Sequence, residues 1–366
     1  MLFQHTGRLA IASAAAVVAG TAIVAATGAR ATTGAAADHL LLSRVTVTAE
    51  ATAVTLTRLT GAGTGDGTAI ELPVTVSGVD KPFTIEGDSA GVGALARSAD
   101  GRYVTLAGYA AEPGTATTSV PRVVARVDAA GAVDTSTTLG TSFMQEEVRG
   151  AVTADGARFW VTGHGATAAP NGGLVQATLG ASSGTVLAGG TGALNDTRTV
   201  QLAGGSLWFG SEKEPAGLYE YTAGVVTQPV ALGSGGSGPI AFVLLDRDAA
   251  VAGVDTLYLL READAVHKYS SDGTNWTERG TISGTSAWTG LTGVVDGTGA
   301  RLYGIDGAGA GNTLVQVTDS AEFSSPPSAS ARTTVATAPG GVAFRGVALA
   351  PGDPSPSSPA SAPVSY

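Results

Sequence analysis

The chain has 366 residues, of which 43% are hydrophobic and 14% are charged, with 53 glycines, no cysteine and a net charge of −10. The apolar content is too high for a chain that is disordered throughout, and the acidic balance argues against nucleic acid or anionic lipid as a partner, because both bind basic surfaces. Without cysteine no disulfide contributes to stability, so we expect a core of short β-strands joined by tight turns.

Residues 1–31 are predicted to be a signal peptide. Arg8 precedes an uncharged, mostly apolar run over residues 9–28, and Ala29-Arg30-Ala31 is a small-residue cleavage site. The alternative is an uncleaved membrane anchor, since the run approaches the length that spans a bilayer. Cleavage after Ala31 leaves 18 basic and 30 acidic residues, a net charge of −12, and no further membrane span. We therefore expect a secreted, extracellular protein, and the lack of cysteine is more typical of bacterial export.

The first strands are predicted over residues 40–45, 53–59 and 69–76, with a glycine-rich turn over residues 61–67. Residues 150–165 then show a hairpin, because Asp155-Gly156 separates two β-prone runs and both turn positions tolerate a positive φ. Related hairpins recur along the rest of the chain. The repeat predicts one opening strand for each unit, beginning near residues 92, 148, 198, 240, 291 and 344.

The repeat is divided between the two ends of the chain, which predicts a closed ring. The chain begins with three strands that lack an opening strand and ends with an opening strand, residues 344–350, that no further unit follows. We therefore expect an all-β fold, a single closed β-propeller over residues 38–351 whose last strand completes the N-terminal blade. The opening strands predict six blades, or seven if residues 45–90 conceal another, and a β-sandwich or β-solenoid is the alternative. Residues 352–366 form a Pro/Ser-rich tail that we expect to be disordered.

Several short runs carry a resemblance to a known group of proteins. They are Ser-Ala-Asp-Gly-Arg-Tyr-Val-Thr-Leu-Ala-Gly-Tyr (98–109), Asp-Gly-Ala-Arg-Phe-Trp-Val-Thr-Gly (155–163), Asp-Thr-Leu-Tyr (255–258), His-Lys-Tyr with Trp-Thr (267–277) and Phe-Arg-Gly-Val-Ala-Leu-Ala-Pro (344–351). With them the chain resembles, over about residues 40–351, a family of uncharacterised exported bacterial β-propeller proteins. The resemblance implies the fold and export, and no activity. The chain departs from the pattern at Trp288-Thr289-Gly290, where the family tends to have an Arg-Gly pair.

Known catalytic and metal-binding motifs lack their proper context in this sequence. Gly180-Ala-Ser182-Ser-Gly184 matches the nucleophile pattern G-x-S-x-G, but it lies in a predicted turn and the pattern needs a strand-to-helix junction. Asp246-Arg247-Asp248 lacks the EF-hand spacing and is interpreted as part of a surface turn. After cleavage of the signal peptide the remaining histidines are far apart, at His39, His164 and His267. We therefore predict no metal site and no cofactor, and identify no catalytic residue.

One constellation of charged residues is predicted to converge. Arg149, Arg198 and Arg345 occupy the same position near the start of their opening strands, and in a propeller these strands face the central channel. Glu147 and Asp196 stand two residues before an arginine and are predicted to neutralise the arginines as structural ion pairs. Alternatively the arginines bind an anionic group of a ligand, because the guanidinium fork matches carboxylate, sulfate or phosphate.

Asp246, at the end of the fourth opening strand, is a further candidate, either as an acid at the mouth of the channel or as a strand-end ion pair with Arg247. The sequence thus predicts a secreted, monomeric binding or interaction protein. Its partner is an extracellular ligand, with an anionic glycan or a protein as candidates. The alternative is an extracellular lyase or hydrolase that acts on an anionic polysaccharide or a phosphoester, and the third option is a purely structural surface protein.

Overall fold

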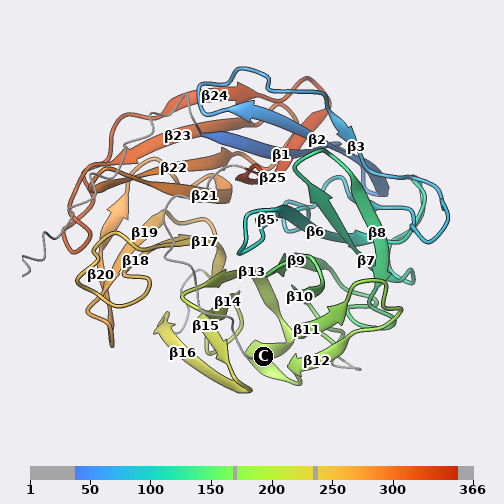
Figure 1. Ribbon diagram of the computed structural model, residues 1–366, viewed down its shortest axis with the longest axis horizontal. Helices are drawn as coiled ribbons and strands as arrows, with labels where there is room; N and C mark the ends of the chain where they lie inside the picture. Colours follow the sequence, from blue (N-terminus) through green and yellow to red (C-terminus); the bar gives the residue numbers. More distant parts are fainter. Residues whose placement is uncertain (1–37, 168–170, 234–237, 353–366) are drawn as a thin grey trace, which may run out of the picture. The chain divides into compact units, whose positions relative to one another are not determined.

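The computed structural model describes residues 38–167, 171–233 and 238–352, which all belong to one compact unit, Thr32–Tyr366. The fold over these residues is an all-β propeller (Figure 1). The predicted signal peptide, residues 1–31, and residues 353–366 of the predicted tail lie outside the described residues, so both stay predictions. Within the described part of the chain, no helix has the length and apolar character needed to cross a bilayer.

Four separate sheets have four antiparallel strands each, in the order predicted for propeller blades. Their strands are β9 (Val148–Thr153), β10 (Arg158–Gly163), β11 (Gly173–Thr178) and β12 (Thr185–Ala188); β13 (Thr197–Ala203), β14 (Ser206–Ser211), β15 (Gly217–Thr222) and β16 (Val225–Ala231); β17 (Pro239–Leu245), β18 (Thr256–Arg261), β19 (Val266–Ser271) and β20 (Trp276–Ile282); and β21 (Trp288–Asp296), β22 (Gly299–Asp306), β23 (Thr313–Asp319) and β24 (Thr333–Thr337).

The predicted Asp155-Gly156 turn joins β9 to β10. Gly156 has a φ of +83°, a conformation that glycine adopts without the steric penalty of a Cβ. The turn is held by Thr153 Oγ1, which accepts from the Gly156 amide at 2.8 Å, and by the Asp155 carboxylate, which accepts from the Ala157 amide at 2.9 Å. Local chemistry therefore sets the register of this hairpin, in which Phe159 pairs with Thr153.

The remaining strands form one nine-stranded sheet, so the prediction of a single closed propeller with six separate blades, or with seven, is wrong. No sheet closes on itself, and the regular four-stranded blades number four among the described residues. The sheet has the order β25 (Val342–Leu349), β1 (His39–Thr46), β2 (Ala51–Thr60), β4 (Thr84–Glu86), β6 (Tyr103–Tyr109), β7 (Arg122–Asp128) and β8 (Val133–Thr138), with β3 (Ile70–Glu71) on β2 and β5 (Ala96–Arg97) on β6.

The physical reason for the merged sheet is the short strand β4. Thr84 pairs with Ala53 of β2 on one side and with Tyr109 of β6 on the other, which joins two units that the repeat predicted to be separate. The third strand that the sequence predicted over residues 69–76 is only two residues long, β3. β2 therefore keeps an edge that β4 occupies.

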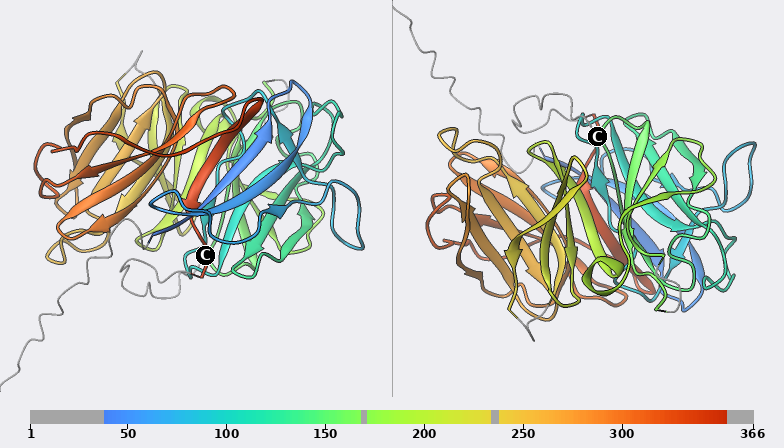
Figure 2. Two further views of the ribbon diagram at one scale, coloured as in Figure 1. Left: turned by 90° about the horizontal axis from the view of Figure 1, so that it is seen from above. Right: turned by 90° about the horizontal axis from the view of Figure 1, so that it is seen from below.

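The pairing between the two ends of the chain is as predicted. β25 pairs with β1 in antiparallel register, with Leu42 opposite Val347, and Figure 2 shows the red C-terminal strand beside the blue N-terminal one. The innermost strands β5, β9, β13, β17, β21 and β25 then contact one another in succession around a common axis (Figure 1). The ends of the chain are thus joined within the nine-stranded sheet.

The glycine after each of two axial arginines lets neighbouring strands approach closely. A Cβ at Gly150 would lie 3.2 Å from the Cα of Thr199 on β13, and a Cβ at Gly346 would lie 2.2 Å from the carbonyl oxygen of Gly93. The hydrophobic core lies between adjacent sheets, as where Ala107 of β6 packs in one cluster with Phe159 and Val161 of β10. The Arg-Gly pairs therefore serve the packing around the axis as well as placing the arginines.

A buried ion pair also joins two of the sheets. Lys268 of β19 lies 2.8 Å from Asp319, the last residue of β23, and both side chains are fully buried. Tyr258 of β18 donates a hydrogen bond of 2.7 Å to the same carboxylate, and Arg247 donates one of 3.0 Å to the Tyr258 hydroxyl. We call Arg247, Tyr258, Lys268 and Asp319 the inter-sheet cluster.

Candidate functional site

The innermost strands surround a cavity of about 280 Å³ on the axis. Its wall is made by the first residues of each inner strand and by the segment over residues 90–96. Exposed residues of the turns lie around one end, among them Glu262, Ser286 and Ala308. Residues further along the strands, such as Phe242 and Leu291, are buried. The cavity is therefore lined by both polar and apolar side chains, as ligand sites in proteins commonly are.

All three arginines that the sequence singled out line this cavity. Arg149 is on β9, Arg198 on β13 and Arg345 on β25, which are far apart in sequence and meet only at the axis. Arg345 is 3% exposed, and the side chains of Arg149 and Arg198 are 7% and 13% exposed. The convergence follows from the equivalent positions of the inner strands. The three guanidinium groups nevertheless differ in their partners.

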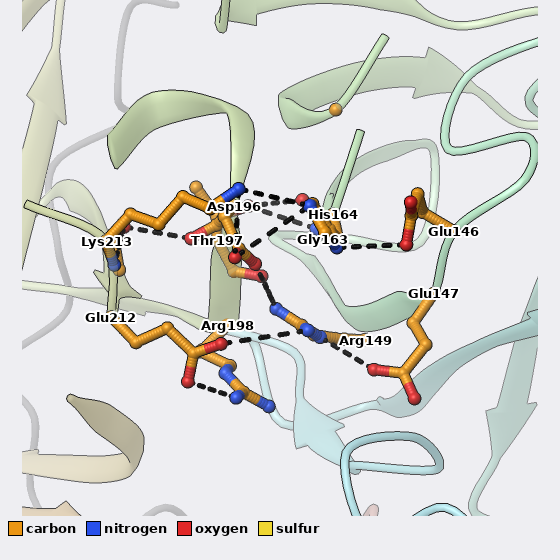
Figure 3. Close-up of polar contacts among 12 residues, drawn as sticks. Glu146, Glu147, Arg149, Gly163, His164, Asp196, Thr197, Arg198, Glu212 and Lys213 are labelled. Atoms are coloured by element: carbon orange, nitrogen blue, oxygen red, sulfur yellow. Dashed lines mark hydrogen bonds and ion pairs between the residues drawn. The ribbon is translucent and has the colours of Figure 1, made fainter. Parts of the chain in front are cut away.

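Arg149 is surrounded by carboxylates (Figure 3). Its Nε donates to Glu147 at 3.1 Å, its Nη1 donates to Asp196, and its Nη2 lies 3.9 Å from Glu212. Burial by itself lowers the pKa of the guanidinium, but the charges of Asp196, Glu147 and Glu212 outweigh it and raise the pKa above its ordinary value. Arg149 is therefore a fully neutralised structural centre, as the ion-pair alternative predicts.

The two carboxylates that the sequence assigned to the arginines are both held in their charged form. Burial by itself raises the pKa of Glu147, but the hydrogen bond from Ser89 and the charge of Arg149 lower it below its usual value. Burial by itself also raises the pKa of Asp196, but the charges of Arg149 and then of His164 outweigh it and lower the pKa below its usual value. Asp196 therefore serves the arginine of the neighbouring sheet rather than Arg198 on its own chain segment.

Arg198 pairs with Glu212, which the sequence analysis did not identify. Arg198 Nη2 donates to the Glu212 carboxylate (Figure 3), and no acceptor contacts its Nε. Glu212 follows the last residue of β14, at the same end of the axis as the arginines. The signal was available in the charged run Glu212-Lys213-Glu214, but only the strand pairing shows that it faces Arg198.

Arg345 differs from the other two arginines. Within the described part of the chain no carboxylate lies within ion-pair distance of it, and its Nη1 and Nη2 donate to the carbonyl oxygens of Ala308 and Gly87. Its Nε is buried and has no acceptor among the residues that the structure describes. Burial lowers the pKa of this guanidinium, and Asp88 offsets the effect only in part. A buried charge without a contacting carboxylate is costly, so Arg345 is the place where an anionic ligand would be stabilised most.

Two other candidates lie away from the cavity. Asp246 follows β17, whereas the cavity uses Ile240 to Phe242 near the start of that strand, so the structure does not bring Asp246 together with the arginines. His164 contacts Glu146 at 3.1 Å and Lys213 at 3.2 Å, and its Nε2 lies 3.9 Å from Asp196. Figure 3 shows His164 beside Asp196, and His164 is not among the residues that line the cavity.

The other side of the cavity is apolar. Where β9, β13 and β25 carry arginines, β17 carries Ile240 and β21 carries Trp288 and Thr289. The departure from the Arg-Gly pattern at Trp288-Thr289-Gly290 thus falls on this wall. Among the residues with described placement, no group of three or more His, Asp or Glu side chains is arranged to hold a metal ion.

Comparisons with known proteins add the following findings. No protein-family model matches the chain, and no curated protein is significantly similar to it. Similar solved structures include the periplasmic gluconolactonase of Pseudomonas aeruginosa, with 14% identity over 81% of this chain and 82% of that chain and a TM-score of 0.48. A GH74 enzyme of Niastella koreensis has 14% identity over 77% of this chain, which spans 43% of that chain, with a TM-score of 0.47. A gluconolactonase of Xanthomonas campestris has 11% identity over 73% of this chain and 92% of that chain, with a TM-score of 0.39. These similarities are too distant to assign a ligand or an activity to this chain.

Proposed function

We propose that this protein binds a small anionic ligand in the axial cavity, with Arg345 as the residue that neutralises it. The observation that carries the proposal is the position of Arg345: it lines the cavity, is 3% exposed, and has no carboxylate partner in the described part of the chain. A guanidinium with unused N–H groups in a partly apolar cavity is a strong anion site, because the low dielectric strengthens its hydrogen bonds.

Arg122 is a buried arginine that lies outside the cavity. It too donates to carbonyl oxygens, those of Thr117, Val120 and Glu146, and it packs over the ring of Tyr109 at 5.0 Å. The two arginines thus resemble each other in their carbonyl partners and their buried Nε, and they differ in that Arg345 lines a space of ligand size.

We propose binding in preference to catalysis. An enzyme acting at Arg345 needs a proton-transfer group within hydrogen-bond reach of the ligand. His164 contacts Asp196 and Lys213 and does not line the cavity, and Glu262, a carboxylate that does line it, lies on an exposed turn. We propose further that the protein is exported and acts outside the cytoplasm, which rests on the sequence of residues 1–31. Mass spectrometry of the secreted product, expected to begin at Thr32, tests this part.

The experiment for the binding function is a titration of the purified protein with acetate, benzoate, sulfate and phosphate, followed by calorimetry. We expect at least one of these anions to bind, and Arg345→Gln to weaken that binding about ten- to a hundredfold, as the loss of a charged hydrogen bond of about 1.5–3 kcal/mol implies. The control is Arg102→Gln, since Arg102 has a side chain that is 62% exposed and lies outside the cavity. The proposal fails if no anion binds, or if Arg345→Gln binds as the wild type does.

A further inference from the structure

The charges around the cavity limit how much negative charge a ligand can carry. Arg149 and Arg198 provide two positive charges, and three carboxylates, Glu147, Asp196 and Glu212, contact them. This group has no positive charge to spare for a ligand, and Glu147 and Glu212 repel a second anionic group beside it. Arg345 is the cavity arginine that no carboxylate contacts in the described part of the chain, and the charges of Asp88 and of Glu262, which lines the cavity, act against a further anionic group. The cavity therefore suits a ligand with no more than one negative charge.

The hydrogen-bond geometry of Arg345 favours a carboxylate. Its Nη1 and Nη2 each carry two N–H groups and each donates one hydrogen bond, to Ala308 and to Gly87, while its Nε is buried. A guanidinium presents its N–H groups in a planar fork that matches the two oxygens of a carboxylate. The same fork binds phosphate, but a phosphate monoester carries up to two negative charges at neutral pH and meets the repulsion of the nearby carboxylates.

The walls away from the arginines favour an apolar ligand body. Leu95, Ile240, Phe242, Trp288, Leu291 and Val347 line the cavity. An apolar cavity of about 150 Å³ holds benzene, so the 280 Å³ found here leaves room for one ring together with a carboxylate. We propose that the ligand is a small monocarboxylate with an apolar body, its carboxylate on Arg345 and its body against the wall of Ile240 and Trp288.

This inference rests on the proposed anion site, and its test separates the two. The purified protein is titrated with phenylacetate, glucuronate, phenyl phosphate and 2-phenylethanol by calorimetry. We expect phenylacetate to bind at least tenfold more tightly than each of the others, because only phenylacetate combines one carboxylate with an apolar ring. Arg345→Gln is expected to reduce its affinity at least tenfold, to near that of 2-phenylethanol.

A second variant tests the apolar wall directly. Ile240→Thr keeps the branched shape and adds a hydroxyl to the wall, and we expect it to weaken phenylacetate at least threefold while leaving glucuronate unchanged. The matched control is Val225→Thr on β16, whose side chain is 59% exposed and lies outside the cavity.

The outcomes are distinct. If glucuronate or phenyl phosphate binds as tightly as phenylacetate and both depend on Arg345, the anion site stands and the apolar monocarboxylate is overturned. If 2-phenylethanol matches phenylacetate, the charge argument is overturned. If none of the three anionic probes binds, and acetate, benzoate, sulfate and phosphate also fail, the proposed function and this inference fall together.

Discussion

The inter-sheet cluster and the site around Arg345 treat a buried cation in opposite ways. Lys268 meets Asp319 at 2.8 Å with both side chains fully buried, and Tyr258 adds a hydrogen bond to the same carboxylate. Arg345 is nearly as buried, donates to two carbonyl oxygens and lines the cavity, and no carboxylate contacts it in the described part of the chain. The comparison shows that two cations of similar burial differ in whether a carboxylate of the protein contacts them.

The largest effect is expected from breaking the complete pair. Asp319→Asn leaves the Lys268 ammonium buried without a counter-charge, and we expect it to lower the free energy of unfolding by about 3–5 kcal/mol. Urea denaturation followed by tryptophan fluorescence measures the change.

A double variant sharpens this result. Replacing both partners, as Lys268→Met with Asp319→Leu, removes the uncompensated charge, so most of the loss should be recovered. A double variant as unstable as Asp319→Asn would show that the cluster acts through shape or its other hydrogen bonds, and not through the ion pair.

A smaller difference is expected between two cavity arginines. Arg149→Met leaves Glu147, Asp196 and Glu212 without their common partner, and we expect a loss of about 3 kcal/mol, the low end for a broken buried pair because Glu147 and Glu212 stay partly in water. Arg345→Met leaves two carbonyl oxygens without donors, which costs stability, but it also removes a buried charge that no carboxylate of the described residues contacts. We therefore expect the free energy of unfolding to fall by less than the loss for Arg149→Met, by about 1 kcal/mol. Equal losses in urea denaturation would contradict the contrast between the two sites.

The smallest expected effect is the dependence of stability on pH. The pKa values of Glu147, Asp196 and Asp319 are lowered in the folded protein, each by neighbouring donors and cations that outweigh the effect of burial. An ordinary Asp or Glu in the unfolded chain titrates near pH 4. The unfolded chain therefore takes up protons first as the pH falls, and the stability that is complete above about pH 5 should decline below about pH 4. Denaturation midpoints between pH 3 and 7 measure this, and a midpoint that rises on acidification would contradict it.

Much of the fold was predictable because its signals are local. The Asp155-Gly156 turn, the alternation of apolar residues and the opening strands near residues 148, 198 and 240 follow from preferences of neighbouring residues, and β9, β13 and β17 begin within one residue of those positions. The strand predicted near residue 92 is only two residues long, β5, because Gly93 has a φ of +81° and packs against Arg345.

The blade count was not predictable from the repeat. The predicted count was wrong because of β4, a strand of three residues with no turn signal of its own. Thr84 of β4 pairs with residues of β2 and β6 that lie more than twenty positions before and after it in the sequence. Short strands have little periodicity to detect, and only the tertiary arrangement decides which edge they occupy.

For the candidate site, the sequence alone determined that Arg149, Arg198 and Arg345 share one position in their strands, and hence that they line one axial cavity. Only the tertiary structure decided their partners. Arg149 pairs with Asp196, which lies 47 residues away and directly precedes β13. Arg198 pairs with Glu212, and Arg345 has no contacting carboxylate in the described part of the chain. The position of a residue in a strand depends on local backbone geometry, so the sequence can predict it. Ion pairing depends on distances of a few ångströms between segments that are far apart in the chain, so it is known only from the tertiary structure.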